Sequence, residues 1–320
     1  MTLEEAIKKV KPLDRNAMDI AQKRWDSIAK PLHSLGKLET LLIQIAGITG
    51  NAEIDLSKRG LIAMCADNGV VEEGVTQTGQ EVTAIVAENF LNYDTSVGVM
   101  CKQNHAEIFP VDMGMITDTK VRTDHKVAYG TKNMTKGPAM TRKQAVKGIE
   151  SGIAMVEELK GKGYKILATG EMGIGNTTTS SAVASVLLNQ PVEEMTGRGA
   201  GLTSEGLARK IGAIRKAIKL NQPDPSDAVD VLAKVGGLDI AGMAGVFLGG
   251  AIYGIPVVMD GFISCVSALI AMQICPAAGD YMIASHVSRE PAAHLILEHM
   301  NKEAVLHADM CLGEGTGAVA

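Results

Sequence analysis

The spacing of apolar residues changes along the chain from a helical pattern to an alternation of strand-like and helical segments. Apolar side chains recur every three or four positions through residues 1–50, which predicts helices joined by a connector at 30–36. Short apolar runs that end in a polar residue or glycine then alternate with longer helical stretches. The runs cover residues 60–67, 107–112, 165–170, 255–260, 281–286 and 308–313. The helical stretches cover residues 79–104, 143–162, 177–190, 204–219, 239–252 and 261–274.

This alternation predicts an α/β fold with a mostly parallel six-stranded sheet and helices on both faces. A chain of 320 residues is long enough for one large domain, alone or with a small appendage. Ligands of such sheets bind outside the carboxyl ends of the strands. Polar, glycine-rich segments follow the predicted strands, and we expect them to converge on one site. They cover residues 67–69, 112–114, 171–178, 260–261, 286–290 and 313–315.

Two of these segments hold a carboxylate in a glycine-rich turn. Glu171 is followed by glycines two and four residues later, and Glu314 lies between Gly313 and Gly315. Glycine lets the backbone turn sharply and approach a ligand, whereas glutamate is a poor choice for a turn that has only to reverse the chain. A buried, unpaired carboxylate has a raised pKa and can act as a base near neutral pH. We interpret Glu314 as functional; the alternative is a carboxylate that accepts N–H groups of its own loop.

Asn176, Thr177 and Thr178 can be read in two ways. They follow a predicted strand and begin a predicted helix, where free N–H groups favour a phosphate. The same residue types are also ordinary helix caps. The segment is neither a dinucleotide fingerprint, since Thr178 stands at the position of the third glycine, nor a Walker A loop. A dehydrogenase is disfavoured as well, because no acidic ribose-binding residue follows at the expected distance.

Two further segments combine turn residues with cations. A glycine cluster at 197–201 precedes a predicted helix that contains Arg209 and Lys210. A flexible loop with a solvated helix face fits this pattern, and so do cations placed over a phosphate. Ser288 and Arg289 follow another predicted strand just before a predicted helix, where they suit phosphate binding or capping.

Composition and charge exclude several classes of protein. The net charge of −5 and the aromatic content of 3% argue against a nucleic-acid or anionic-membrane partner. The five cysteines form no close pair, which indicates buried thiols in a reducing compartment. The N-terminus has no apolar signal core and the apolar stretch 240–255 is too short to span a bilayer, so we expect a cytoplasmic protein. His286 and His294 lack the spacing of a zinc motif, so we expect no metal.

Several of these segments occur, in the same order, in one known family. The chain resembles the nicotinate-nucleotide–dimethylbenzimidazole phosphoribosyltransferases, which make the lower-ligand nucleotide of cobamides. The resemblance extends over nearly the whole chain, and several long motifs placed independently are far more specific than any single glycine pattern. The motifs cover residues 30–31, 34–39, 67–70, 73–76, 80–83, 171–178, 197–201, 286–291 and 312–318.

The resemblance implies a Rossmann-like fold and a reaction. The 5-phosphoribosyl group of nicotinate mononucleotide passes to 5,6-dimethylbenzimidazole or a related lower-ligand base, giving α-ribazole 5′-phosphate and nicotinate with inversion at the anomeric carbon. By position, Glu314 is the expected general base and Glu171 supports the site. The expected nucleotide- and phosphate-binding residues are Gly173, Gly175, Asn176, Thr177, Lys210 and Ser288. The expected base-binding residues are Gln80, Met172 and Leu312. No cofactor is implied.

The resemblance also implies a homodimer with shared active sites and a small helical domain built from the chain ends. We expect residues 1–55 to form the N-terminal part of that domain and residues 56–320 the catalytic α/β domain, whose C-terminal end contributes to the small domain or is truncated from it. Asn68 stands where family members commonly have His, and related enzymes accept purines or phenolics, so the preferred base is left open. The alternative to an active enzyme is a catalytically weak, nucleotide-binding partner subunit of a heteromeric phosphoribosyltransferase that acts on phenolic bases.

Overall fold

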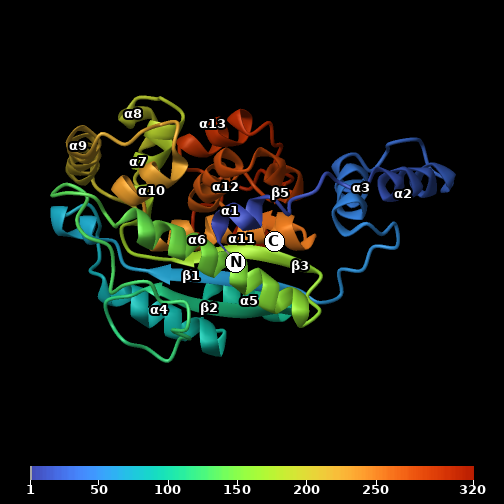
Figure 1. The fold of residues 1–320 in the computed structure, drawn as a ribbon, viewed down its shortest axis with the longest axis horizontal. Coiled ribbons are helices and arrows are strands. Elements are labelled where there is room, and N and C mark those ends of the chain that lie inside the picture. The colour runs from blue at the N-terminus through green and yellow to red at the C-terminus, as the bar shows by residue number, and fades with distance from the viewer. Residues whose placement is uncertain (1) are drawn as a thin grey trace.

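A five-stranded parallel sheet forms the centre of the computed structural model, which describes residues 2–320 (Figure 1). The strands follow the spatial order β2-β1-β3-β4-β5. Each pairs in parallel with its neighbours, so β1 contacts β2 on one side and β3 on the other. The predicted α/β class and parallel sheet are confirmed, with one strand fewer than expected. The strands are β1 Arg59–Ala66, β2 Ala106–Gly114, β3 Ile166–Met172, β4 Val257–Met259 and β5 Met282–Ala284.

The helices occupy most of the stretches that their periodicity predicted. Those before β3 are α1 Leu3–Ile7, α2 Arg15–Ser27, α3 Lys37–Thr49, α4 Glu81–Asn92, α5 Ser96–Gln103 and α6 Arg142–Gly161, with a short 3₁₀ helix η1 at Gly69–Glu73. Those between β3 and β4 are α7 Asn176–Leu187, α8 Val192–Met195, α9 Ser204–Asn221, α10 Ala228–Val235 and α11 Leu238–Tyr253. The last group is α12 Phe262–Ile274, η2 Pro276–Tyr281, α13 Ala292–His299 and α14 Thr316–Val319.

One predicted helical stretch, 79–104, contains two helices rather than one. Tyr93 ends α4 in the left-handed conformation, with φ of +60°. Thr95 then caps α5, because its side chain accepts the N–H of Gly98. Apolar periodicity continues across this break, and for that reason the pattern alone predicted a single helix.

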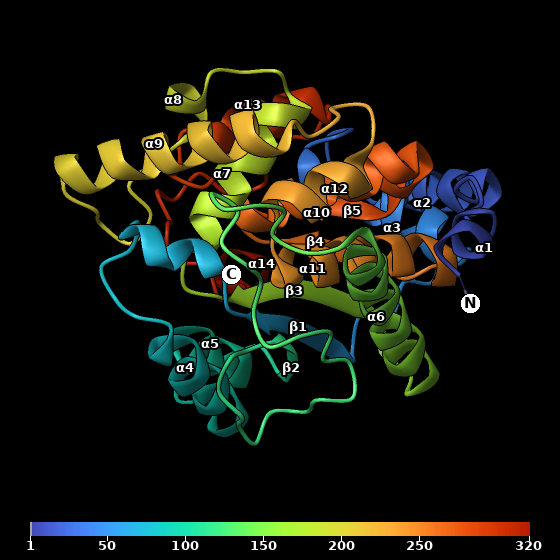
Figure 2. The same cartoon turned by 60° about the vertical axis from the view of Figure 1, so that its left-hand side comes forward.

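The side chains of β1 point alternately into two cores, as a strand buried on both faces requires. Ile62 and Met64 belong to the larger core, which includes α6 and α11. Leu61 and Cys65 belong to a smaller core with α4 and α5. The helices α4 and α5 contact β2 and lie beside it in Figure 2, whereas α11 contacts β1, β2 and β3 from the side of the larger core. The prediction of helices on both faces is therefore confirmed.

The sixth predicted strand, at 308–313, is wrong. This part of the chain contributes only an isolated parallel bridge between His286 and Leu306. Asp309 and Glu314 have positive φ angles. A residue in the left-handed region cannot continue a pleated strand, so the short apolar run turns away from the sheet instead of extending it.

The N-terminal helices divide between two places. The pair α2 and α3 projects to one side of the sheet (Figure 1) and has a small apolar core of its own, which includes Ala17, Ala21 and Ala46. The first helix, α1, packs instead against α6 and α11. The domain boundary near residue 55 stays a prediction. At the other end of the chain, α14 packs against α5 and β3.

No helix within residues 2–320 is long and apolar enough to cross a membrane.

Candidate active site

A cavity lies where the order of the sheet changes direction. Strand β2 lies on one side of β1, and β3, β4 and β5 lie on the other. The connections that leave β1 and β3 therefore run in opposite directions along the sheet. Ligands of open α/β sheets bind at this point. The cavity has a volume of about 460 Å³, which falls in the range typical of small-molecule sites. Its lining residues come from the segments 75–78, 171–177, 198–202, 260–264, 286–290 and 311–314.

Four of the six polar segments predicted to converge contribute to this lining, and two do not. Residues 67–69 and 112–114 are not in the lining, and Asp67, Asn68 and Asp112 have no exposed surface. Asp67 accepts the N–H of Ile116, and Asp112 forms an ion pair with Lys126 at 3.0 Å. These polar groups are therefore used within the fold and do not face the cavity.

The turn after β3 requires glycine at two positions. Gly175 has φ of +93°, and a Cβ atom on Gly173 would lie only 2.4 Å from the carbonyl oxygen of Ala66. The turn thus passes closely over the end of β1. Gly175 begins α7, and no side chain from the described residues caps this helix. The N–H groups of Asn176 and Thr178 donate to the carbonyls of Gly173 and Gly175, at 3.0 and 2.9 Å, whereas that of Thr177 has no partner within residues 2–320 and can bind an anion.

The second turn places Glu314 beside Glu171. Gly313, Glu314 and Gly315 have φ angles of +95°, +62° and +100°. The N–H of Glu314 donates to Oε1 of Glu171 at 3.4 Å, and Oε2 of Glu314 accepts the N–H of Val97 at 3.2 Å. Two carboxylates from distant parts of the sequence therefore lie in one wall of one cavity.

Burial changes the proton affinity of both carboxyl groups. It raises the pKa of Glu171 to about 8, with smaller contributions from the charges of Asp239 and Asp260. Burial also raises the pKa of Glu314, and the N–H groups at the start of α5 act in the opposite direction. A carboxyl group with a raised pKa in a cavity wall is suited to accept a proton near neutral pH.

Lys210 lies behind the first turn of α7. Its side chain is fully buried, and its Nζ donates to Oγ1 of Thr177 at 2.8 Å and to the carbonyl of Gly197 at 3.2 Å. Burial lowers the pKa of Lys210 to about 8, although the charge of Glu290 opposes this shift. The ammonium group of Lys210 therefore lies behind the side chain of Thr177, at the N-terminal end of α7.

The structure brings most of the predicted site residues to the cavity. Those in its lining are Glu171, Met172, Gly173, Gly175, Asn176, Thr177, Ser288, Leu312 and Glu314. Lys210 and Gln80 are not among the lining residues; Nε2 of Gln80 donates to the backbone carbonyl of Asn68 at 3.1 Å. The amide of Asn176 donates to the Glu171 side chain, so it faces a carboxylate as well as the cavity. The chemical roles of these residues stay predictions.

Three acids at or near the cavity were given no role of their own by the sequence analysis, although Asp260 and Glu290 belong to segments that it predicted to converge. Asp260 and Glu290 line it, and Oε1 of Glu290 accepts the N–H of Gly199 at 3.0 Å. Asp239 is fully buried at the start of α11, where burial raises its pKa to about 7. The available signals were weak: Asp260 ends an apolar run before Gly261, and Asp239 interrupts an apolar stretch.

The mouth of the cavity contains a free thiol. Cys311 is exposed and belongs to the lining, next to Leu312, which is 58% exposed. Of the other cysteines, Cys275 is half-buried, whereas Cys65, Cys101 and Cys265 are buried.

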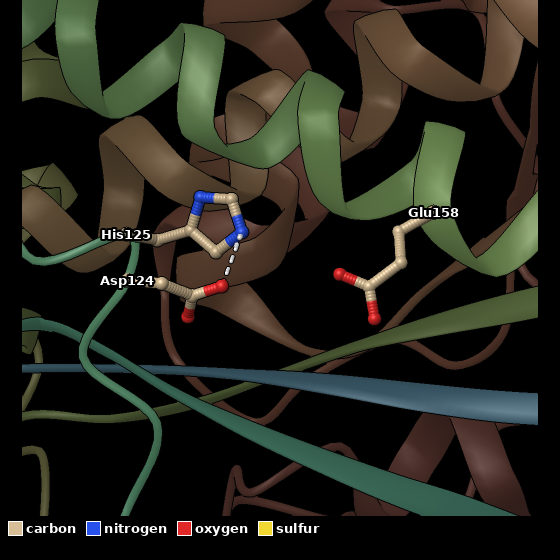
Figure 3. A group of neighbouring side chains, drawn as sticks. All are labelled: Asp124, His125 and Glu158. Atoms are coloured by element: carbon tan, nitrogen blue, oxygen red, sulfur yellow. Dashed lines mark ion pairs between the residues drawn. The ribbon is translucent and has the colours of Figure 1, made fainter.

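One group of side chains elsewhere has the composition of a metal site. Asp124, His125 and Glu158 place one ligand atom each within 4.8 Å of one another (Figure 3). The guanidinium of Arg122 forms ion pairs with both carboxylates. Lys162 forms a further ion pair with Glu158 at 2.6 Å, so two cations balance the two negative charges and the cluster is better described as a surface ion-pair network.

Comparisons with known proteins agree with the motifs. A family model described as phosphoribosyltransferase matches residues 10–320. The chain is 50% identical to a nicotinate-nucleotide–dimethylbenzimidazole phosphoribosyltransferase of Ruminiclostridium cellulolyticum, over 99% of this chain and 91% of that protein. It is 49% identical to the enzyme of the same name from Clostridium acetobutylicum, with the same coverage. Among solved structures, CobT from Thermus thermophilus superposes with a TM-score of 0.89 at 35% identity, covering 95% of this chain and 92% of the other.

Proposed function

Because the chain belongs to the nicotinate-nucleotide–dimethylbenzimidazole phosphoribosyltransferase family, we propose that it transfers the 5-phosphoribosyl group of nicotinate mononucleotide to a lower-ligand base with Glu314 as general base. The products are α-ribazole 5′-phosphate, when the base is 5,6-dimethylbenzimidazole, and nicotinate. Whole-chain relatives named as this enzyme give no support to the alternative of a catalytically weak partner subunit. A cytoplasmic location stays a prediction from the sequence.

The reaction replaces one ring nitrogen at the anomeric carbon by another. A nitrogen of the base attacks C1′ of the ribose while the bond from C1′ to nicotinate breaks, and the electron pair of that bond neutralises the pyridinium nitrogen of nicotinate. Attack on the face opposite the leaving group inverts the anomeric carbon. The incoming azole becomes positively charged, and Glu314 accepts the proton on its other ring nitrogen. A fixed carboxylate stabilises this developing charge and then removes it.

The observation on which this proposal rests is the proximity of the two carboxylate turns. The N–H of Glu314 lies 3.4 Å from Oε1 of Glu171, and both residues line the same cavity. In the proposed mechanism Glu171 supports the turn of Glu314 and remains largely protonated at neutral pH, since its pKa is raised to about 8. A neutral Glu171 leaves Glu314 as the better proton acceptor.

Nucleotide binding is proposed at the start of α7. The N–H of Thr177, which has no partner within residues 2–320, and the close-passing turn of Gly173 and Gly175 favour the phosphate or the ribose of the donor. Lys210 acts through Thr177, since its Nζ donates to the threonine hydroxyl at 2.8 Å. Ser288 also lies in the lining and offers a hydroxyl donor.

The base is proposed to bind beside the apolar side chains of the cavity. Met172, Val86 and Leu312 lie in the lining, and a flat aromatic ring requires such an apolar surface. Gln80 contributes indirectly, by holding the backbone at Asn68. Benzimidazoles, purines and phenolics share this flat shape, and a competition among them in one reaction would identify the preferred base.

We also propose that the enzyme is a homodimer with shared active sites, as the family resemblance implies. Leu32, Leu35 and Leu38 are 65%, 46% and 56% exposed around the connector before α3, which supports a protein contact there. Light scattering at micromolar concentration should give the mass of two chains. A single-chain mass at that concentration would contradict the proposal.

Replacement of Glu314 by Gln tests the proposed base directly. We expect kcat to fall by about 10²- to 10⁴-fold, because the proton of the azole loses its acceptor, while nicotinate mononucleotide still binds. Chromatography of both products measures the rate, and calorimetric titration measures nucleotide binding. Glu298→Gln, which alters an exposed carboxylate on α13, should retain full activity and serves as the control. Wild-type turnover in Glu314→Gln would exclude this role.

A further inference from the structure

Asp260 directly follows β4 and contacts the turn that contains Glu314. Its side chain is almost fully buried. Oδ2 accepts the N–H of Gly315 at 3.0 Å, and Oδ1 accepts the N–H of Gly317 at 2.7 Å. One carboxylate thus binds two backbone N–H groups immediately after Glu314. These are charge-assisted hydrogen bonds of good length.

The turn of Glu314 needs an external support of this kind. Glu314 is a non-glycine residue with φ of +62°, a conformation that costs roughly 1 kcal/mol or more. The helix that follows, α14, has only four residues and is too short to be stable on its own. The contact from Glu314 N–H to Glu171 is long, at 3.4 Å. Within the turn, Thr316 bonds to the carbonyl of Gly313 through its N–H at 3.0 Å and its hydroxyl at 2.8 Å. The two bonds to Asp260 are the shortest restraints on this backbone from outside the turn.

The surroundings of Asp260 are built to keep it in place. Its own N–H donates to Oγ of Ser264 at 3.1 Å, on the first turn of α12. His286 lies against the backbone of Gly317, where a Cβ atom would be 1.8 Å from Nδ1 of the imidazole and 2.9 Å from Oδ1 of Asp260. Glycine at 317 is thus required for the carboxylate and the imidazole to reach the turn together.

The charge of Asp260 also acts on Glu314, since it raises the pKa of that residue. The other titratable groups that face this pair are Glu171 at the end of β3, His286 after β5 and Cys265 on α12. Burial raises the pKa of Asp260, whereas the charge of His286 and the bound N–H groups lower it.

From this geometry we propose that Asp260 is the positioning residue for the general base, holding the turn of Glu314 in the orientation that proton transfer requires. The inference rests on the proposed role of Glu314. Asp260 acts on the reaction through the backbone at 315 and 317, and not by taking the proton itself.

The central test compares Asp260→Asn with Asp227→Asn. Asp227 also accepts two backbone N–H groups, but at the start of α10, away from the cavity lining. We expect Asp260→Asn to lower kcat by about 10- to 100-fold with the KM for nicotinate mononucleotide within about threefold of wild type. The acid limb of its kcat/KM profile should move by about half a pH unit or more to lower pH, because Glu314 loses a negative neighbour. Asp227→Asn should change neither quantity.

Three results would overturn the proposal. The first is a kcat within twofold of wild type, and the second is a loss of kcat with an unmoved acid limb, which indicates a purely structural role. The third is a raised KM for nicotinate mononucleotide with kcat intact, which indicates a direct nucleotide ligand. The acid limb is compared between variants that use the same substrates. Any titration of a substrate therefore affects all the profiles equally.

A double-mutant cycle separates this inference from the function on which it rests. In the Glu314→Gln background, Asp260→Asn should cost less than about twofold further, measured as product accumulated over hours. Additive losses would show that Asp260 does not act through Glu314. If Glu314→Gln alone keeps wild-type kcat, the proposed base is wrong; if it loses activity while Asp260→Asn does not, only the present inference fails.

Gly317→Ala provides a second route if Asp260→Asn does not fold. The added methyl group forces the turn away from His286 and Asp260 while leaving the charge of Asp260 in place. We expect kcat to fall by about tenfold or more with an unmoved acid limb. Full kcat in a folded Gly317→Ala protein would contradict the proposal.

Discussion

Glu171 is a buried carboxyl group with other acids as neighbours, and its protonation connects the site to the stability of the fold. Its pKa is about 8 in the folded protein against an ordinary value of 4.5. A group whose folded-state pKa is raised contributes stability that is fully present below the unfolded pKa and is lost as pH rises through the folded one. The protein without substrate should therefore lose stability between pH 4.5 and about 8.

Glu171→Gln tests this linkage. The amide stays neutral at every pH, so the variant should exceed the wild type in unfolding free energy by about 2 kcal/mol at pH 8.5 relative to their difference at pH 5. Denaturant unfolding at the two pH values measures this change, and Glu53→Gln, an exposed carboxylate, is the control. Parallel pH profiles for the variant and the wild type would contradict the assignment.

Lys210 should make nucleotide binding sensitive to alkaline pH. Its pKa is lowered to about 8, so its charge fades above that pH and the KM for nicotinate mononucleotide should rise. Lys210→Met should raise that KM about 10- to 100-fold and remove its dependence on pH, in line with the loss of one charge-assisted contact. Lys219→Met, an exposed lysine on the same helix, should behave as wild type. Steady-state kinetics from pH 7 to 9.5 decide the question.

At the scale of single residues, the sequence pointed to positions where the residue type is unusual for the predicted local structure. Glu314 was predictable because a glutamate among glycines has no structural purpose in a turn. Gln80 and Lys210 were harder to place, since pattern and spacing do not tell whether a side chain faces a cavity or lies one layer behind it. Asp260 was predicted to lie near the site but was given no role, because a single aspartate at a strand end is common and its partners are 55 and 57 residues away.

Among the elements, α5 has a direct effect on the proposed base. Its first turn binds the carboxylate of Glu314 through the N–H of Val97 at 3.2 Å. Thr95 caps this helix, with its hydroxyl accepting the N–H of Gly98 at 3.0 Å. The cap therefore stabilises both the helix and the group that orients Glu314.

Thr95→Ala should show this dual effect. We expect a loss of about 1 kcal/mol in unfolding free energy, the usual cost of an N-cap threonine, together with a fall in kcat of a few-fold. Thr203→Ala removes the equivalent cap of α9, where the hydroxyl of Thr203 accepts the N–H of Gly206 at 3.1 Å. Thr203→Ala should lower the unfolding free energy by a similar amount without lowering kcat. Thermal denaturation and product chromatography measure the two effects, and equal kcat values for the two variants would contradict the proposed link.

The type of each element was easier to predict than its ends. Most helical stretches were found because apolar periodicity persists over many residues. The break at Tyr93 was missed because one left-handed residue does not change that periodicity. The sixth strand was predicted wrongly because four or five apolar residues fit an extended loop as well as a strand, and tertiary pairing decides between them.

At the scale of the whole molecule, the parallel sheet explains why distant segments meet. Strands in parallel place all their carboxyl ends at one edge, so polar segments after different strands could be expected to gather there. The order of the strands was not predictable, because local patterns contain no information about which strand pairs with which. With that order, the connections after β3, β4 and β5 line the cavity together with residues 75–78 from the connection after β1, while no residue between β2 and β3 is in the lining.

The exposed thiol of Cys311 at the cavity mouth makes the molecule suitable for site-directed labelling. A maleimide dye should react there first, because the other cysteines are buried or half-buried. Bound nicotinate mononucleotide should slow the reaction by about tenfold or more, since Cys311 lines the cavity in which the nucleotide is proposed to bind. Peptide mapping of the modified chain checks the position, and equal labelling rates with and without nucleotide would contradict the placement. The attached fluorophore would then report, in real time, each arrival and departure of substrate.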